Sequence, residues 1–333
     1  MEVRKVQITG GSTFTVSLPK EWATDSGIEA GSELAFYPEG EALITTPLQA
    51  TRKESVRINA ADLSPNELRS QLITLYINGF SEIDLEDDTI DTDRRQVARR
   101  VATELVGFEI SSETDDRVVL KDFLDPAELS VHSTVMRMRL LALSMLEDSM
   151  ATLLEQDTEQ AMSVIERDDD VDQLWYVVSR VFRAVLHDPQ SVAAIDVTRE
   201  TCFDYRSCAR QLERIADHTV KIAVQSHDID RLPESTSEPL AELEAAACTI
   251  VEDAVDAFLV DDSEQAMELA TDVLTRTDEM DNYVRSIEEQ LREAEPLDAQ
   301  QLGLIVDSLL RIGDYGGNIA ETALQKAAPS PSM

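Results

Sequence analysis

The sequence contains LERIADHTVKIA at residues 212–223 and a closely similar stretch, LLRIGDYGGNIA, at residues 309–320. Two further phrases recur in the same order, DTEQAM (157–162) as DSEQAM (262–267), and RDDDVDQL (167–174) as RTDEMDNY (276–283). Three matches in one order indicate an internal duplication, whereas one short match alone can arise by chance in so acidic a chain. The second half of the chain is therefore predicted to contain two copies of one structural unit.

Long amphipathic helices are predicted throughout this half. Apolar residues recur every three or four positions, as at Val171, Leu174, Val178, Val181 and Val185. Such stripes are typical of the core seams of antiparallel helical bundles. Breaks near Pro189, at residues 231–239 and near Pro296 divide the region into about six helices. The sequence thus predicts two tandem three-helix bundles, at residues 130–229 and 234–327.

Two pairs of carboxylates lie four residues apart in the first copy: Asp168 with Asp172, and Glu213 with Asp217. That spacing places both side chains of a pair on one helix face, about 6 Å apart, where they repel each other unless they share a cation. At about 100° per residue each pair falls beside the apolar stripe, so we expect all four at the bundle surface, open to solvent. Because 66 acidic residues give roughly 13 such pairs by chance, a solvated acidic face is the alternative interpretation.

The second copy departs from the first at two of these positions. Thr277 stands in place of Asp168 and Leu310 in place of Glu213, which leaves Asp281 and Asp314. Two lone carboxylates hold a metal poorly, so a second site is expected to be weak or absent.

The sequence does not fix the roles of two further residues, Asn318 and His218. Asn318 occupies the place of Lys221 and is a candidate to compensate in part for the two carboxylates that the second copy lacks. His218, next to Asp217, is expected to be either a peripheral ligand or an exposed helix residue. The exposed position is the favoured alternative.

The tandem bundles, the D-x-x-x-D element at residues 168–172 and the E-R-I-x-D-H phrase at residues 213–218 resemble the PhoU family of phosphate-signalling regulators. The resemblance implies metal binding on the bundle surface by Asp168, Asp172, Glu213 and Asp217, and more weakly by Asp281 and Asp314. Oxygen ligands favour hard cations such as Mg²⁺, Ca²⁺, Mn²⁺ or iron. The resemblance to the PhoU family also implies a regulator of phosphate uptake that contacts the phosphate ABC transporter or a sensor kinase.

Residues 52–125 show a mixed pattern. Strand-like runs alternate with two helical segments, the first capped by Ser64 with Glu67 at capping-box spacing and ended by Gly79. This pattern predicts a small α/β sandwich without a phosphate loop, nucleophile or metal cluster. Four arginines gather on its second helix, as an anion-attracting group or a face paired with nearby acids: Arg94, Arg95, Arg99 and Arg100.

Residues 1–49 predict a small all-β module. Short alternating runs (VQI, FTVSL, LAFY and ALIT) are separated by turns, and a short helix begins at Pro19. Four strands this short bury little surface alone, so the module is expected to gain its core by dimerising or docking.

This module, most specifically VSLPKEW at residues 16–22, resembles the SpoVT/AbrB family, whose members interleave two chains into one swapped-hairpin barrel and bind DNA. The resemblance implies a homodimer and contacts of Arg4, Lys5 and Lys20 with the phosphates of duplex DNA. The segment holds seven acidic and three basic residues, so dimerisation without DNA binding is the alternative.

The chain of 333 residues has a net charge of −37, yet 43% of its residues are apolar, which indicates a folded multidomain protein with an acidic surface. Only six of its 29 cations are lysine, and such a surface suits a salt-rich, halophilic cytoplasm where ions screen repulsion over about 3 Å. The three cysteines, Cys202, Cys208 and Cys248, suggest neither disulfides nor a zinc site. With no signal peptide or membrane-spanning run, the protein is expected to be cytoplasmic, without membrane insertion.

Enzyme chemistry is not indicated. The sequence offers no catalytic Ser-His-Asp or Cys-His set, no dinucleotide loop, and no Glu-x-x-His pairs suited to a di-iron bundle, and it contains four scattered histidines. A non-enzymatic, DNA-binding regulator is the leading hypothesis. A metal-binding helical adaptor that dimerises through its N-terminal module without binding DNA is the alternative.

Overall fold

A computed structural model describes residues 2–39, 42–48, 55–61, 63–124, 129–155, 158–195, 197–227, 229, 232, 234–291 and 296–329. The chain divides into two compact units, residues 1–53 and 54–333. Each unit is described by itself below.

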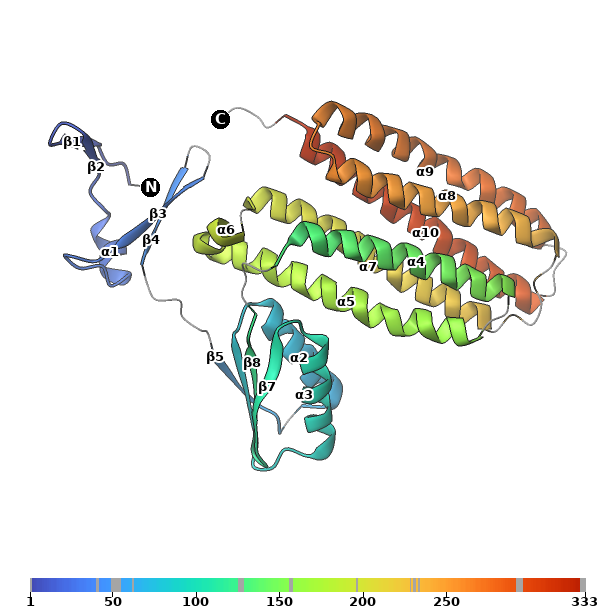
Figure 1. The fold of residues 1–333 in the computed structure, drawn as a ribbon, viewed down its shortest axis with the longest axis horizontal. Helices are drawn as coiled ribbons and strands as arrows, with labels where there is room; N and C mark the ends of the chain where they lie inside the picture. Colours follow the sequence, from blue (N-terminus) through green and yellow to red (C-terminus); the bar gives the residue numbers. More distant parts are fainter. Residues whose placement is uncertain are drawn as a thin grey trace. The chain divides into compact units, whose positions relative to one another are not determined.

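The first unit consists of two β-hairpins joined by a short helix (Figure 1). Its elements are β1 (Gln7–Thr9), β2 (Thr13–Thr15), α1 (Lys20–Asp25), β3 (Leu34–Glu39) and β4 (Ala42–Pro47). β1 pairs antiparallel with β2, and β3 with β4. None of the residues described between 2 and 48 is buried. The predicted strands and helix are therefore present, and this unit has no core of its own within one chain.

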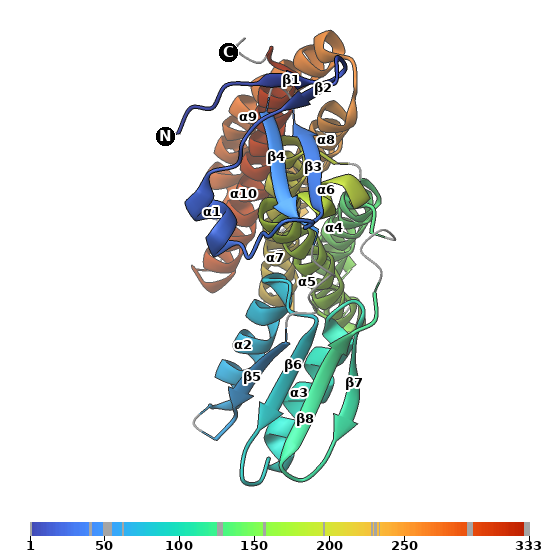
Figure 2. The ribbon, with the colours of Figure 1, turned by 90° about the vertical axis from the view of Figure 1, so that its left-hand side faces the viewer.

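The second unit begins with a two-layer α/β domain. Its elements are β5 (Ser55–Asn59), α2 (Pro65–Ile77), β6 (Glu82–Glu86), α3 (Thr92–Glu104), β7 (Phe108–Glu113) and β8 (Arg117–Asp122). The sheet order is β5-β6-β8-β7, with β5 and β6 parallel and the other pairs antiparallel. Apolar residues of the inner sheet face pack against both helices, in one cluster that includes Ile83, Leu120, Leu72 and Val101. Figure 2 shows α2 and α3 on the same side of the sheet.

Local sequence signals set the ends of these helices as expected. The Ser64 hydroxyl accepts from the Glu67 N–H at 3.4 Å while the Glu67 carboxylate accepts from the Ser64 N–H at 2.9 Å, a complete capping box at the start of α2. Gly79 follows the helix with φ +93°, a conformation that glycine adopts without strain. On α3, Arg94, Arg95 and Arg99 pair with acids of this domain, which agrees with a paired face rather than a free anion site.

Seven helices form the rest of the second unit: α4 (Val131–Glu155), α5 (Thr158–His187), α6 (Pro189–Ile195), α7 (Arg199–His227), α8 (Glu234–Leu259), α9 (Ser263–Leu291) and α10 (Pro296–Ala327). Helices α4, α5 and α7 form one bundle and α8, α9 and α10 the other (Figure 1). The sequence predicted the six long helices. The seven-residue α6 was not predicted, because only the break at Pro189 marked that segment.

The two bundles share one continuous hydrophobic core. Helix α4 packs on α8 and α7 packs on α10, so the duplicated units face each other through corresponding helices. The nearly buried Arg139 on α4 reinforces this contact, since it donates to Asp256 on α8 at 2.5 Å and to Glu252 at 3.2 Å. Among the described residues, no helix is both long enough and apolar enough to cross a bilayer.

Arg180 on α5 joins the α/β domain to the first bundle. Its side chain is 12% exposed and donates to the Asp122 carboxylate at 2.5 Å and to the main-chain oxygens of Phe80 (3.3 Å) and Tyr76. The guanidinium also lies 4.6 Å from the centre of the Tyr76 ring. One arginine therefore satisfies groups from three places in the α/β domain, which attaches that domain to α5.

Candidate functional site

The candidate ligands of the first copy lie on two neighbouring helices. Asp168 and Asp172 are on α5, and Glu213 and Asp217 are on α7, which packs beside α5. The apolar stripes of both helices point into the shared core, so that the four carboxylates flank the line of contact between α5 and α7. We call these four residues the α5–α7 carboxylates.

Their exposure differs from the prediction. Asp217 is exposed and Asp168 and Asp172 are half-buried, but Glu213 is only 8% exposed. The Arg210 guanidinium donates to Glu213 Oε1 at 2.5 Å. The expectation that all four would stand open to solvent is therefore wrong for Glu213, since a helical-wheel angle does not reveal how neighbouring side chains pack around a residue.

The four charges act on one another. Burial raises the pKa of Asp168 to about 6, and the negative charges of Asp172 and Asp217 add to that rise. Burial raises the pKa of Glu213 to about 7, an effect that Arg210 opposes and that Asp217 and Asp172 strengthen. Burial also raises the pKa of Asp172. These carboxylates therefore share a site with too little positive charge to hold them all ionised.

The fit of a metal to this group is mixed. The donor atoms are all oxygens, and the buried Glu213 Oε2 has no hydrogen-bond partner, which leaves this oxygen able to bind a cation. Yet, over the described part of the chain, no three His, Cys, Asp or Glu side chains come close enough together to hold an ion. The donor chemistry fits a hard cation, but the present side-chain positions do not converge on one point.

The α/β domain reaches this group, which the sequence did not indicate. The Tyr176 hydroxyl donates to Asp172 Oδ2 at 3.1 Å, and the positive charge of Arg69, on α2, also acts on Asp172. Arg69 in turn pairs with Glu104 at 2.9 Å. The Arg69 contact joins residues far apart in the sequence, so no pattern within one segment could have revealed it, whereas Tyr176 and Asp172 lie four residues apart on α5.

The corresponding positions of the second copy carry no such group. Leu310 packs against the helical core and the Thr277 hydroxyl donates to the Val273 carbonyl at 3.0 Å. Asp281 and Asp314 are both exposed, and Asp314 accepts from Arg311 at 3.2 Å. The substitutions thus leave two separate surface carboxylates.

Asn318 and His218 lie at the contact between the bundles. The Asn318 amide donates to Gln211 Oε1 on α7 at 3.3 Å. His218 is 9% exposed, with its ring 5.6 Å from that of Tyr315 on α10, and burial lowers its pKa. The expectation of an exposed His218 is therefore wrong, because α10 covers the face of α7 that carries it.

The three predicted DNA contacts lie in the first unit. Arg4 precedes β1 and pairs with Glu2 at 2.7 Å, Lys5 is its exposed neighbour, and Lys20 is exposed at the start of α1. Arg4 therefore already has one carboxylate partner within its own unit.

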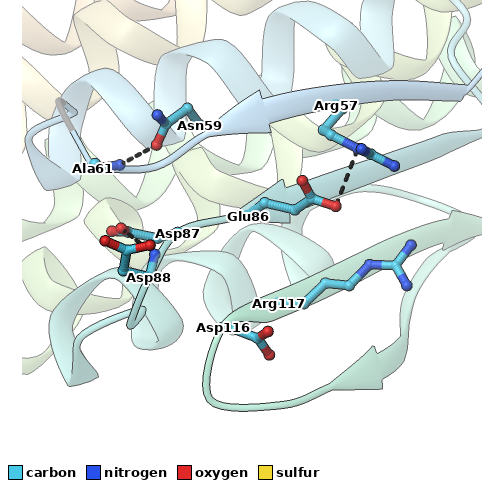
Figure 3. Close-up of a pocket in the computed structure, with 8 residues that line it drawn as sticks. All are labelled: Arg57, Asn59, Ala61, Glu86, Asp87, Asp88, Asp116 and Arg117. Atoms are coloured by element: carbon cyan, nitrogen blue, oxygen red, sulfur yellow. Dashed lines mark hydrogen bonds and ion pairs between the residues drawn. The ribbon is translucent and has the colours of Figure 1, made fainter.

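The outer face of the α/β sheet carries a shallow hollow of about 560 Å³ at the ends of β5 and β6 (Figure 3). Arg57 and Arg117 line it together with Glu86 and Asp116. Both arginines already pair with acids of the sheet: Arg57 with Glu86 at 3.1 Å and Arg117 with Asp84 at 2.7 Å. The lining also includes Asp87 and Asp88, so acids outnumber the two arginines, and both arginines are already paired. The charges of this hollow therefore do not identify a ligand.

Known proteins are similar to both units. A family model described as "Antidote-toxin recognition MazE, bacterial antitoxin" matches residues 7–52, the segment with the AbrB-like pattern. A curated relative from Clostridium acetobutylicum, named "Phosphate-specific transport system accessory protein PhoU homolog", is 24% identical over 208 residues, which is 58% of this chain and 89% of the relative.

Two solved structures match more than half of the chain. PhoU from Pseudomonas aeruginosa matches with a TM-score of 0.51 and 22% identity, over 60% of this chain and 96% of that one. The phosphate transport system regulatory protein PhoU from Streptococcus pneumoniae matches with a TM-score of 0.49 and 19% identity, over 58% of this chain and 91% of that one.

A second family model, described as the PhoU domain, matches residues 135–225 and 240–323, one match in each bundle. The two matches together span more than half of the chain. The chain belongs to the PhoU domain family.

Proposed function

We propose that this protein is a non-enzymatic regulator of phosphate uptake and homeostasis. The observation that carries the proposal is the tandem match of both bundles to the PhoU domain, joined by the relative named as an accessory protein of phosphate-specific transport. The proposed partners are a phosphate ABC transporter or a sensor kinase. We propose a cytoplasmic location in a salt-rich cell, in keeping with the acidic, lysine-poor composition.

The second part of the proposal is a metal site in the first bundle. Asp168, Asp172, Glu213 and Asp217 would hold Mg²⁺, Ca²⁺, Mn²⁺ or iron after rotation of their side chains. The mutual repulsion of these carboxylates and the unpaired Glu213 Oε2 support this assignment. The metal would supply the missing positive charge and thereby hold α5 and α7 together at this position.

The third part is a homodimer formed through the first unit. Its strands expose large apolar side chains, among them Ile8, Phe14, Phe36 and Leu43, each more than half exposed. Apolar area of this kind is stable when a second copy covers it. We propose that the dimer binds duplex DNA through Arg4, Lys5 and Lys20. The few cations and the Arg4–Glu2 pair favour the second candidate, an adaptor that dimerises without binding DNA.

The two candidates differ in their response to duplex DNA. The regulator should bind random duplex with an affinity that falls as salt rises, by a slope near the number of phosphates contacted. An Arg4→Gln/Lys5→Gln variant should bind more weakly and with a smaller slope. No detectable binding at any salt concentration would leave the adaptor as the function of this unit.

Phosphate regulation is tested in cells that lack the gene. Such cells should lose the phosphate dependence of phosphate uptake and of transporter expression, and the wild-type gene should restore both. An Asp168→Ala/Asp217→Ala gene should restore them poorly if the metal site matters for signalling. Uptake and expression that stay normal after deletion would refute the proposed function.

A further inference from the structure

Three arginines on α5 and α7 lie together beside the carboxylates and have an unusual environment. The Arg206 guanidinium lies 5.0 Å from the centre of the Trp175 ring and 5.2 Å from that of Phe182. Arg210 lies over the same Trp175 ring at 5.3 Å. Arg183 directly follows Phe182 on α5. Two aromatic rings of α5 therefore hold the guanidinium groups of α7 next to a third arginine.

Two of these three arginines lack an acidic partner of the kind that pairs with many other cations of this chain. Among the described residues, Arg183 and Arg206 have no ion pair, and Arg210 pairs with Glu213 alone. Burial lowers the pKa of Arg206, and the positive charges of Arg183 and Arg210 lower it further, with no carboxylate acting in the opposite direction. Among the described residues, Arg183 and Arg206 are thus cations without an ion-pair partner in a chain of net charge −37.

A buried hydroxyl adds an unused polar group to this place. Ser179 is one turn from both Trp175 and Phe182 on α5, which puts it on the same helix face. Its side chain is 3% exposed, and its Oγ has no hydrogen-bond partner. A buried, unpaired hydroxyl is uncommon and is a potential donor to an anion.

The second copy shows that the fold does not need this arrangement. The phrase alignment places Gly303 at the position of Arg206, Asp307 at that of Arg210 and Val284 at that of Trp175. The second bundle forms the same three-helix structure with these residues. The arginines and the tryptophan therefore belong to a feature of the first copy alone, rather than to the packing of the repeat.

We propose that Arg183, Arg206 and Arg210 form a binding site for a doubly charged tetrahedral oxyanion of the phosphate class. Guanidinium groups bind such anions through paired N–H donors, and three of them near one place are balanced better by two negative charges than by one. The site adjoins the α5–α7 carboxylates through the Arg210–Glu213 pair but is formed by other residues, so the inference goes beyond the proposed function and does not require a metal.

Calorimetric titration with inorganic phosphate tests the site, at constant potassium chloride and in chelator-treated full-length protein. The wild-type protein should bind phosphate saturably, and sulfate should compete while acetate at equal ionic strength should not. Loss of one charge-assisted contact in Arg206→Gln should weaken binding by roughly 10- to 100-fold. Arg183→Gln should weaken it less, because Arg183 is exposed.

Two controls keep the outcome clear. Arg214→Gln removes an arginine from the same helix that lies over Tyr315 instead, so this variant should bind phosphate as the wild type does. The Asp168→Ala/Asp217→Ala variant should also keep its phosphate affinity, which separates this site from any metal-dependent binding. Thermal unfolding followed by circular dichroism checks that each variant is folded.

A spectroscopic signal gives a second readout at the site itself. The chain has two tryptophans, Trp22 and Trp175, so a Trp22→Phe protein reports on Trp175 alone. Phosphate should change the Trp175 fluorescence with the affinity found by calorimetry. Absence of saturable phosphate binding to the wild type, equal binding by acetate, or an unchanged affinity in folded Arg206→Gln would each overturn the proposal.

Discussion

Glu244 on α8 is a half-buried acid whose charge is unfavourable in the folded state. Burial raises its pKa to about 7, and the negative charge of Glu147 on α4 adds to the rise. A carboxylate with a raised folded pKa binds protons in the native state that the unfolded state has released, so stability falls as pH rises from about 4.5 to about 7. Glu244 therefore costs stability at neutral and alkaline pH.

The variant Glu244→Gln should be more stable than the wild type by on the order of 1–3 kcal/mol at pH 8 and equal to it near pH 4.5. Denaturant unfolding at several pH values measures the difference. Glu242→Gln is the matched control, because Glu242 is an exposed acid on the same helix. A stability difference for Glu244→Gln that does not change with pH would contradict this account.

Arg180 is expected to hold the α/β domain on α5. Replacing it with alanine leaves the Asp122 carboxylate, itself 12% exposed, without its cation and leaves the Phe80 carbonyl without this donor. Removal of one partner of a buried pair costs about 3–5 kcal/mol. We expect Arg180→Ala to loosen the α/β domain from α5, seen as faster amide hydrogen exchange in α2 and β8. Exchange unchanged in both elements would show that Arg180 does not hold this junction.

Sequence patterns predicted the positions of several site residues but not the contacts of their side chains. The i,i+4 spacing indicated two pairs of carboxylates that repel each other, and only the family resemblance grouped Asp168, Asp172, Glu213 and Asp217 into one site; in the structure their charges act on one another. The spacing could not show the hydrogen bond from Arg210 to Glu213, because that depends on a side-chain direction. The effect of Arg69 on Asp172 and the role of Arg180 depend on a domain that is distant in sequence.

At the scale of elements, helix α10 shows why the second copy is rich in glycine. A Cβ added at Gly316 would lie 2.7 Å from Ile250 Cγ2 and 3.3 Å from the Val251 nitrogen, both on α8. The absence of a side chain at this position therefore lets α10 and α8 approach closely. In the first copy the equivalent position is Thr219, so the two bundles do not have the same interhelical contacts.

We expect Gly316→Ala to destabilise the protein by about 1–3 kcal/mol through overpacking, in spite of the roughly 1 kcal/mol that alanine adds to helix propensity. Gly303→Ala on the same helix is the control, because nothing lies within 4 Å of its added Cβ. That variant should gain about 1 kcal/mol from helix propensity. Thermal unfolding compares the two, and a stable Gly316→Ala protein would refute the close approach.

Elements were the part of the fold most open to prediction. Period-3.6 stripes marked the six long helices, and capping and turn residues such as Ser64, Glu67 and Gly79 set the boundaries of α2. The short α6 follows Pro189 without a stripe of its own, so its sequence carried no periodic signal. The sequence did not predict how the two bundles pack on each other.

At the scale of the whole molecule, the proposed dimer would depend on the apolar face of the first unit. Ile8 and Phe14 are cross-strand partners in β1 and β2 and are 65% and 74% exposed. We expect the wild type to be a dimer in light scattering and Ile8→Asp/Phe14→Asp to be a monomer. Gln7→Asp/Thr15→Asp, the adjacent pair on the opposite strand face, should stay dimeric. A monomeric wild type would refute the dimer.

We propose that the first bundle binds a metal and that the second does not. Metal content after equilibration with Mn²⁺ or iron and removal of free ions, measured by mass spectrometry, tests it most directly. The account predicts metal in the wild type, its loss in Asp168→Ala/Asp217→Ala, and its retention in Asp281→Ala/Asp314→Ala. Metal retained by the first variant, or lost equally from the second, would contradict it.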